Sequence, residues 1–172
     1  DQEQHLEMTR TFALRFNRMY KVDYFPEPQA FNFGKNLVKI PGLNGNGKMG
    51  KSEGEGNAIY LADSPEAIRK KVMKAKTDSG PTEPNQKKPE EIENLFHLMR
   101  AVSKPETVQY FDDLYNSCQI RYGDMKKQLA EDMIQFVAPY SEKIKAYVSD
   151  KDYLDKVAKL GADKARESAQ KT

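Results

Sequence analysis

Residues 45–52 read GNGKMGKS, and this glycine-rich stretch decides between two folds. Its spelling fits G-x-x-x-x-G-K-[ST], the pattern of a P-loop, which needs a buried strand before it and a helix beginning at its Lys-Ser. Here Lys51-Ser52 is followed by Glu-Gly-Glu-Gly-Asn, a poor first helical turn, and Pro41-Gly42 ends the preceding apolar run early. The surrounding sequence therefore disfavours the P-loop fold.

The same loop predicts a mobile lid over a triphosphate. Six of the chain's ten glycines lie in residues 42–57, and two lysines, Lys48 and Lys51, stand three positions apart. Their ammonium groups can neutralise charge on the β- and γ-phosphates while the α-phosphorus is attacked. Lid closure would also exclude water from a reactive mixed anhydride. The loop by itself is equally compatible with a flexible surface loop whose lysines are incidental.

Outside the loop, the hydrophobic spacing predicts a mostly α-helical chain. Apolar residues at helical spacing indicate a helix over residues 4–20, followed by a proline-containing loop at 23–28. Two short apolar runs, 37–40 and 58–61, are typical of strands. Later helices begin at Ser64-Pro65, near residue 92, at a capping box over 103–106, near 124 and near 153, and Pro139 should break or kink one of them.

Composition narrows the class of protein. Of the 172 residues 38% are hydrophobic and 31% charged, and the net charge is only +2, so any basic surface must be local. No apolar run approaches the length that spans a membrane. The single cysteine, Cys118, excludes an internal disulfide, fits a reducing compartment and is expected to be buried or half-buried.

Three segments carry a resemblance to a known family. Residues 1–17, DQEQHLEMTRTFALRFN, strongly resemble the D-Q-x-x-H-[IL]-E-[LM]-[ST]-R-x-x-A-x-R-F-N segment of bacterial tryptophanyl-tRNA synthetases. KMGKS at 48–52 falls where that family carries KMSKS, and LADSPEAIRKKVMKAKTDSG at 61–80 is similar to the helix that follows it. The part from Pro89 onward has the layout of the family's anticodon-binding helices. Tyrosyl-tRNA synthetases share the loop, but their Asp-Gln segment usually continues with Trp-Gly-Asn.

The resemblance implies a class I aminoacyl-tRNA synthetase that activates tryptophan with ATP and Mg²⁺ and passes it to its tRNA. It implies that residues 1–62 are the C-terminal part of a Rossmann-type α/β catalytic domain, and that 63–172 are a helical anticodon-binding domain. The class I His-Ile-Gly-His-type motif is absent from these residues, so we expect the 172 residues alone to be inactive. The full-length protein is expected to be a cytoplasmic homodimer with no membrane association.

Site residues follow from the same resemblance, position by position. Gln2 would contact tryptophan, Asp1 would lie beside the ATP ribose contact, and Ile40 would lie against the adenine. The ATP lid would consist of Lys48, Met49, Gly50, Lys51 and Ser52, with Lys48 and Lys51 on the phosphates. Gly50 departs from the family's serine, which removes a hydroxyl and loosens the backbone. We expect altered lid dynamics and no loss of activity, and we expect His5 to have a structural role.

Two alternatives to a synthetase stay open at this point. A non-catalytic helical module could bind tRNA through the basic run at positions 69–71, 74 and 76, although such a run is equally typical of a solvated helix face. A P-loop nucleotidase would need a helix that begins at Lys51.

Overall fold

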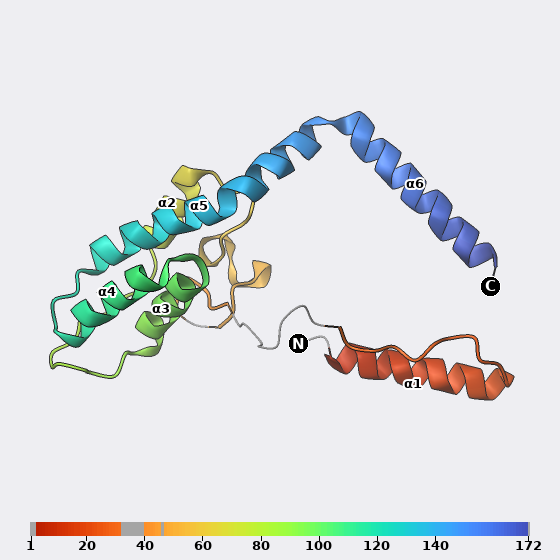
Figure 1. Cartoon of the computed structure of the whole chain (residues 1–172), viewed down its shortest axis with the longest axis horizontal. Coiled ribbons are helices and arrows are strands. Elements are labelled where there is room, and N and C mark those ends of the chain that lie inside the picture. Colours follow the sequence, from red (N-terminus) through yellow and green to blue (C-terminus); the bar gives the residue numbers. More distant parts are fainter. Residues whose placement is uncertain (1–2, 32–39, 46, 172) are drawn as a thin grey trace. The chain divides into compact units, whose positions relative to one another are not determined.

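A computed structural model describes residues 3–31, 40–45 and 47–171 (Figure 1). The chain divides into two compact units, residues 1–38 and residues 39–172. The predicted division after residue 62 separates functional parts of a synthetase and stays a prediction. All regular secondary structure in the described ranges is helical, which agrees with the mostly α-helical fold class.

The first unit is one helix with the following segment folded back along it. Helix α1, Glu3–Tyr20, matches the predicted span of 4–20. The Asn17 side chain accepts hydrogen bonds from the Tyr24 and Phe25 N–H groups, both at 3.1 Å, and donates to the Phe25 carbonyl at 2.8 Å. The Arg10 guanidinium donates to the Pro28 carbonyl at 2.9 Å. These contacts explain why the proline-containing segment runs beside α1 in Figure 1.

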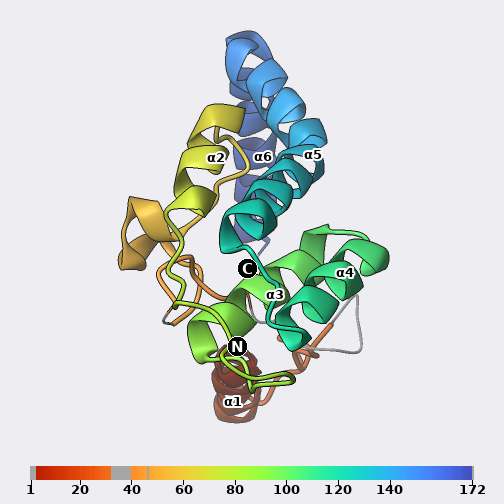
Figure 2. The same ribbon diagram turned by 90° about the vertical axis from the view of Figure 1, so that its left-hand side faces the viewer.

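The core of the second unit is made by four helices. They are α2 (Pro65–Met73), α3 (Glu90–Val102), α4 (Pro105–Asn116) and α5 (Tyr122–Ser149). Figure 2 shows α2 lying beside α5, with α3 and α4 packed together below them. Most of the buried side chains lie where apolar residues recur at helical spacing, among them Ile68, Val72, Ile92, Leu95, Phe96, Met99, Phe111, Met125, Leu129 and Met133. Helical spacing therefore marks the buried faces of α2 to α5, but the apolar residues that recur at the same spacing over 147–160 are exposed.

Of the two predicted helix caps, the one at Ser64 is confirmed and the one at Ser103 is wrong. Ser64 caps α2 as predicted, because its Oγ accepts the Ala67 N–H at 3.2 Å and Pro65 takes the first helical position. The capping box at 103–106 does not form. Pro105 occupies the first position of α4, so the preceding residue, Lys104, becomes the N-cap, and the buried Ser103 hydroxyl has no hydrogen-bond partner in the described structure.

Pro139 does not break the helix that contains it. Helix α5 runs through Pro139 without a break, and the proline lies on the exposed side, where the carbonyl one turn earlier can bind water instead of an N–H. Asp150 then caps α6 (Lys151–Gln170) by accepting the Tyr153 N–H at 2.9 Å. No residue of α6 is buried.

The predicted strand at 58–61 is absent. The Ile59 N–H donates to the Met49 sulfur at 3.5 Å and the Tyr60 N–H to the Asp63 carboxylate at 2.9 Å, so side chains take the bonds that a strand would use. Most of the other predicted strand, 37–40, lies outside the described residues. Within the described part of the chain, no helix is both long and apolar enough to cross a membrane.

Cys118 was expected to be buried or half-buried, and this expectation is wrong. The residue is exposed in the turn between α4 and α5, where its φ of 59° lies in the left-handed region. The reversal of the chain at this turn places Cys118 at the surface, although the neighbouring Leu114 and Ile120 pack against the core.

Candidate functional site

The glycine-rich loop closes on itself at its base. The Met49 N–H donates to the Ile40 carbonyl at 2.9 Å, and Pro41 pairs with Lys48 in an isolated antiparallel bridge. This short pairing places the first lid lysine next to Ile40, the residue assigned to the adenine by resemblance. Lys48 is exposed and Ile40 is 36% exposed, so both remain accessible to a ligand.

A buried asparagine joins the two sides of the base. Asn57 is 3% exposed, and its Oδ1 accepts the Asn44 N–H at 2.9 Å while its Nδ2 donates to the Lys48 carbonyl at 3.4 Å. Its own carbonyl accepts the Leu43 N–H at 3.1 Å. A Cβ added at Gly42 would lie 2.3 Å from Asn57 Oδ1, so this position has space only for glycine.

Beyond the base, the loop forms two single helical turns of the 3₁₀ type, Lys51–Glu53 and Glu55–Asn57, separated by Gly54 at φ 94°. Residues 52–56 are exposed. The first α-helix after the loop begins only at Pro65. The helix that a P-loop needs at Lys51 is therefore replaced by one 3₁₀ turn, which counts against the P-loop interpretation.

Contacts with the helical bundle hold the ends of the loop. The Lys71 ammonium donates to the Asp63 carboxylate at 2.7 Å and to the Ala58 carbonyl at 3.0 Å, and it lies 4.6 Å from the centre of the Tyr60 ring. The Lys76 N–H donates to the Leu43 carbonyl at 3.2 Å. From α3, Asn94 donates to the Gly45 carbonyl at 3.0 Å.

A second lysine ties the end of α2 to α5. The buried Lys126 ammonium donates to the Ala75 carbonyl at 2.6 Å and to the Thr77 hydroxyl at 3.3 Å. Burial lowers the pKa of Lys126 from its ordinary value, because the charged form loses hydration. The stretch that follows the loop is therefore fixed to the bundle at Lys71 and again at Lys126.

The structure brings together only some of the predicted site residues. Ile40, Lys48, Met49 and Gly50 lie at or beside the base of the loop, and Ser52 lies on its exposed tip. Lys51 begins the first 3₁₀ turn. Asp1 and Gln2 lie outside the described residues. His5 is exposed on α1, where its carbonyl accepts the Thr9 hydroxyl at 2.7 Å.

Sequence reasoning missed Asn57, Asp63 and Lys71. Their contacts join positions 8 to 13 apart in the chain without helical or strand spacing, so no periodic signal marks them. The sequence offered only a signal weaker than a periodic pattern: Asn57 ends the glycine-rich loop and directly precedes the apolar run 58–61.

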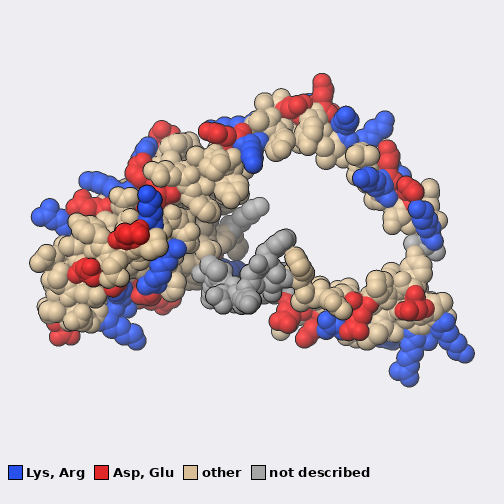
Figure 3. Space-filling model, in the orientation of Figure 1, with Lys and Arg blue, Asp and Glu red and all other residues tan. Residues whose placement is uncertain are grey.

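The basic run of α2 is largely occupied by ion pairs. Arg69 forms two hydrogen bonds to Glu131, at 2.7 and 3.1 Å, Lys71 pairs with Asp63, and Lys76 lies 4.0 Å from Glu91. The hydrogen bond from Arg69 lowers the pKa of Glu131 below its ordinary value. Blue and red side chains are mixed over the face of the second unit drawn in Figure 3, so that face has no continuous basic surface.

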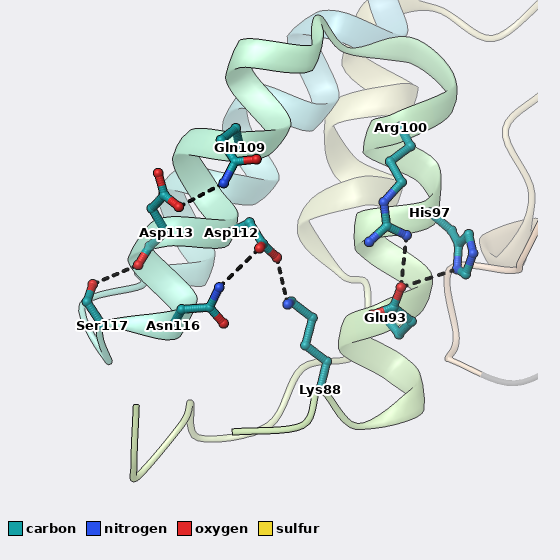
Figure 4. A network of polar contacts seen from close by, with 9 residues as sticks. All are labelled: Lys88, Glu93, His97, Arg100, Gln109, Asp112, Asp113, Asn116 and Ser117. Carbon is teal, nitrogen blue, oxygen red and sulfur yellow. Dashed lines mark hydrogen bonds and ion pairs between the residues drawn. The ribbon is translucent and has the colours of Figure 1, made fainter. Parts of the chain in front are cut away.

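Polar contacts within α3, within α4 and from the segment before α3 to α4 hold this part of the bundle together (Figure 4). The Lys88 ammonium lies 2.6 Å from the Asp112 carboxylate and within 5 Å of two ring centres, 4.8 Å from that of Phe96 and 4.7 Å from that of Tyr115. Glu93 accepts a hydrogen bond from Arg100 at 2.8 Å.

Across the described residues, no group of three His, Cys, Asp or Glu side chains is arranged to hold a metal ion.

Comparison with known proteins decides the family. The sequence model of the tRNA synthetases class I (W and Y) matches residues 1–138, most of the chain. The chain belongs to this family. The family resemblance drawn from residues 1–17 and 48–52 is therefore confirmed, whereas the role of KMGKS as an ATP lid stays a prediction.

Several proteins similar to this chain are tryptophan–tRNA ligases. It is 58% identical over 172 residues to a tryptophan–tRNA ligase of Porphyromonas gingivalis, covering all of this chain and 52% of that protein. It is 39% identical to the corresponding ligase of Helicobacter pylori, covering 51% of that protein. A tryptophanyl-tRNA synthetase structure from Campylobacter jejuni, complexed with ADP and tryptophane, superposes with a TM-score of 0.75 at 26% identity, over 99% of this chain and 51% of that one. The chain thus spans about half the length of these relatives.

Proposed function

We propose that this chain belongs to a tryptophan–tRNA ligase. The carboxylate of tryptophan attacks the α-phosphorus of ATP, which forms tryptophanyl-adenylate and releases pyrophosphate, and the tryptophanyl group then passes to the tRNA with release of AMP. The observation that carries the proposal is the 58% identity to a tryptophan–tRNA ligase along the whole chain. Residues 1–17 support tryptophan over tyrosine, since they follow the Glu-Gln-His pattern in place of Trp-Gly-Asn.

In this proposal the loop acts as the ATP lid. Lys48 and Lys51 neutralise charge on the β- and γ-phosphates as pyrophosphate leaves, while Met49, Gly50 and Ser52 complete the lid. Ile40 lies against the adenine, Asp1 beside the ribose contact, and Gln2 contacts tryptophan. The exposed Lys48 next to Ile40 supports this assignment, because one ligand can then reach both residues. Mg²⁺ would arrive with ATP and neutralise phosphate charge. The described residues offer no metal-binding cluster of their own.

The remaining parts of the chain receive roles in the same proposal. Residues 1–62 would complete a Rossmann-type catalytic domain, and residues 63–172 would contact the anticodon of the tRNA. The four-helix core of the second unit supports a rigid binding domain, since its buried stripe is continuous from α2 to α5. The full-length ligase would act as a homodimer in the cytoplasm.

Pyrophosphate exchange tests the proposal. The full-length protein should incorporate labelled pyrophosphate into ATP only when tryptophan is present, and should charge tryptophan tRNA. Exchange that depends on tyrosine would replace the tryptophan assignment by a tyrosyl-type one. The isolated 172 residues should show no exchange, and strong exchange by them would contradict a requirement for the remainder of the catalytic domain.

A non-catalytic tRNA-binding module is the less supported alternative. Three of the five basic residues proposed to contact phosphates, Arg69, Lys71 and Lys76, are in ion pairs with carboxylates. If the chain were such a module, it would bind tRNA with an affinity that falls steeply as the salt concentration rises. The full-length protein would then catalyse no pyrophosphate exchange.

A further inference from the structure

Asn57 is a buried polar residue that the lid motif does not include. It is 3% exposed, and its amide bonds two separate segments of the loop, at the Asn44 N–H and at the Lys48 carbonyl. Burying an amide is unfavourable unless its hydrogen bonds are made, and leaving a buried partner unsatisfied is more unfavourable still. Both segments are therefore held against this one side chain.

The backbone around Asn57 reinforces the same arrangement. Its N–H donates to the Gly54 carbonyl at 3.1 Å, which closes the second 3₁₀ turn, and its carbonyl accepts the Leu43 N–H at 3.1 Å. The absence of a side chain at Gly42 lets the amide lie against the chain there. Asn57 consequently marks the point where the exposed tip of the loop meets its fixed base.

The residue fixed most directly by this arrangement is Lys48. Its carbonyl is held by Asn57, and the next N–H, that of Met49, is held by the Ile40 carbonyl at 2.9 Å. The Lys48 side chain is nevertheless exposed. Ordering a residue's backbone is entropically unfavourable, so a lysine whose backbone is already fixed needs only to order its side chain when it meets a ligand.

We infer that Asn57 is a positioning residue for Lys48. It holds the Lys48 backbone so that the ammonium meets the triphosphate of ATP as pyrophosphate leaves. This inference rests on the proposed function, because it assigns to Lys48 its role at the phosphates. Asn57 itself touches no substrate, and its effect passes through Lys48.

Kinetics of the full-length ligase test this role. Asn57→Ala should lower kcat for tryptophan-dependent pyrophosphate exchange about 10-fold, since small misplacement of a catalytic group is costly, and should change the KM for tryptophan less than about twofold. Asn57→Asp keeps the acceptor for Asn44 but loses the donor to Lys48, and should lower kcat similarly. In a Lys48→Ala background the Asn57→Ala effect should vanish, because the two residues act as a unit.

Asn94→Ala is the matched control. It also removes an asparagine-to-carbonyl hydrogen bond to the loop, but at Gly45 and from α3. It should lower the melting temperature while keeping kcat within about twofold of the wild type. Hydrogen exchange of the full-length protein gives a readout apart from activity: the Asn44 and Met49 amides should exchange faster in Asn57→Ala and unchanged in Asn94→Ala.

The outcomes separate the inference from the proposed function. The inference alone is overturned if the wild-type protein catalyses pyrophosphate exchange and Asn57→Ala does so equally well. It is also overturned if Asn57→Ala lowers kcat by the same factor in the presence and in the absence of the Lys48 side chain. Absence of exchange by the wild-type protein with every amino acid overturns the proposed function and the inference with it.

Discussion

The bundle core and the base of the glycine-rich loop are both buried, but different forces hold them. The core consists of apolar side chains such as Phe96, Met99 and Leu129, each fully buried. The base is held by the amide of Asn57, by backbone hydrogen bonds and by the space left at Gly42. The core is continuous with the base at Leu43, which is 2% exposed and belongs to the same apolar cluster, but the geometry of the base is fixed mainly by hydrogen bonds. Substitutions in the two regions should therefore have different consequences.

The largest effect on stability is expected in the core. Leu129→Ala in α5 should lower the free energy of unfolding by about 2–5 kcal/mol, because it leaves a cavity where no side chain can move in freely. Urea denaturation measures this loss. The exchange activity of the protein that remains folded should be unchanged, and a fall in its kcat would show that the core also sets the loop geometry.

A substitution at Lys48 should lower activity and leave stability unchanged, the opposite of the core substitution. Lys48→Ala should lower kcat for pyrophosphate exchange about 100-fold, the scale seen when one group that stabilises transition-state charge is removed. Lys48 is exposed, so the melting temperature should stay at the wild-type value. Steady-state kinetics and a thermal melt on the same sample measure both. A large drop in melting temperature would mean that the Lys48 side chain itself contributes to stability.

Gly42→Ala tests the base of the loop directly. The added methyl would lie 2.3 Å from Asn57 Oδ1, so the amide must move, at a cost of about 1–3 kcal/mol in unfolding free energy. The double variant Gly42→Ala/Asn57→Ala should recover part of that loss, because truncating Asn57 makes space for the methyl. Denaturation of the two single variants and the double variant measures the coupling. Simple additivity would contradict the steric contact.

The smallest effect is expected at the tip. Gly50 has φ −151° and ψ 156°, extended backbone that any residue adopts, and an added Cβ would meet nothing closer than 3.9 Å. Gly50→Ser restores the family's residue at the N-cap of the first 3₁₀ turn, where serine exceeds glycine by only about a few tenths of a kcal/mol. Activity should be retained, with a modest change in the KM for ATP. Loss of exchange would show that the loop needs glycine here.

The two regions were also predictable to different degrees. The core followed from hydrophobic spacing, since buried residues such as Ile68, Leu95 and Leu129 belong to apolar patterns that repeat at helical spacing. The lid was predicted from the family resemblance. The residues after Ser52 disfavoured a P-loop, because they make a poor first helical turn. The hydrogen bonds of Asn57 and Lys71 were not found, because polar contacts between irregular segments have no period. The capping box failed because Pro105 fixed the helix start one residue later than the motif indicated.

The exposed turn at Cys118 has a practical consequence. Because it is the only cysteine in these 172 residues and its thiol is accessible, a maleimide dye would attach at one known point between α4 and α5. A fluorophore there leaves every residue of the lid unmodified. Its emission or anisotropy would report on what the helical bundle binds, independently of nucleotide turnover.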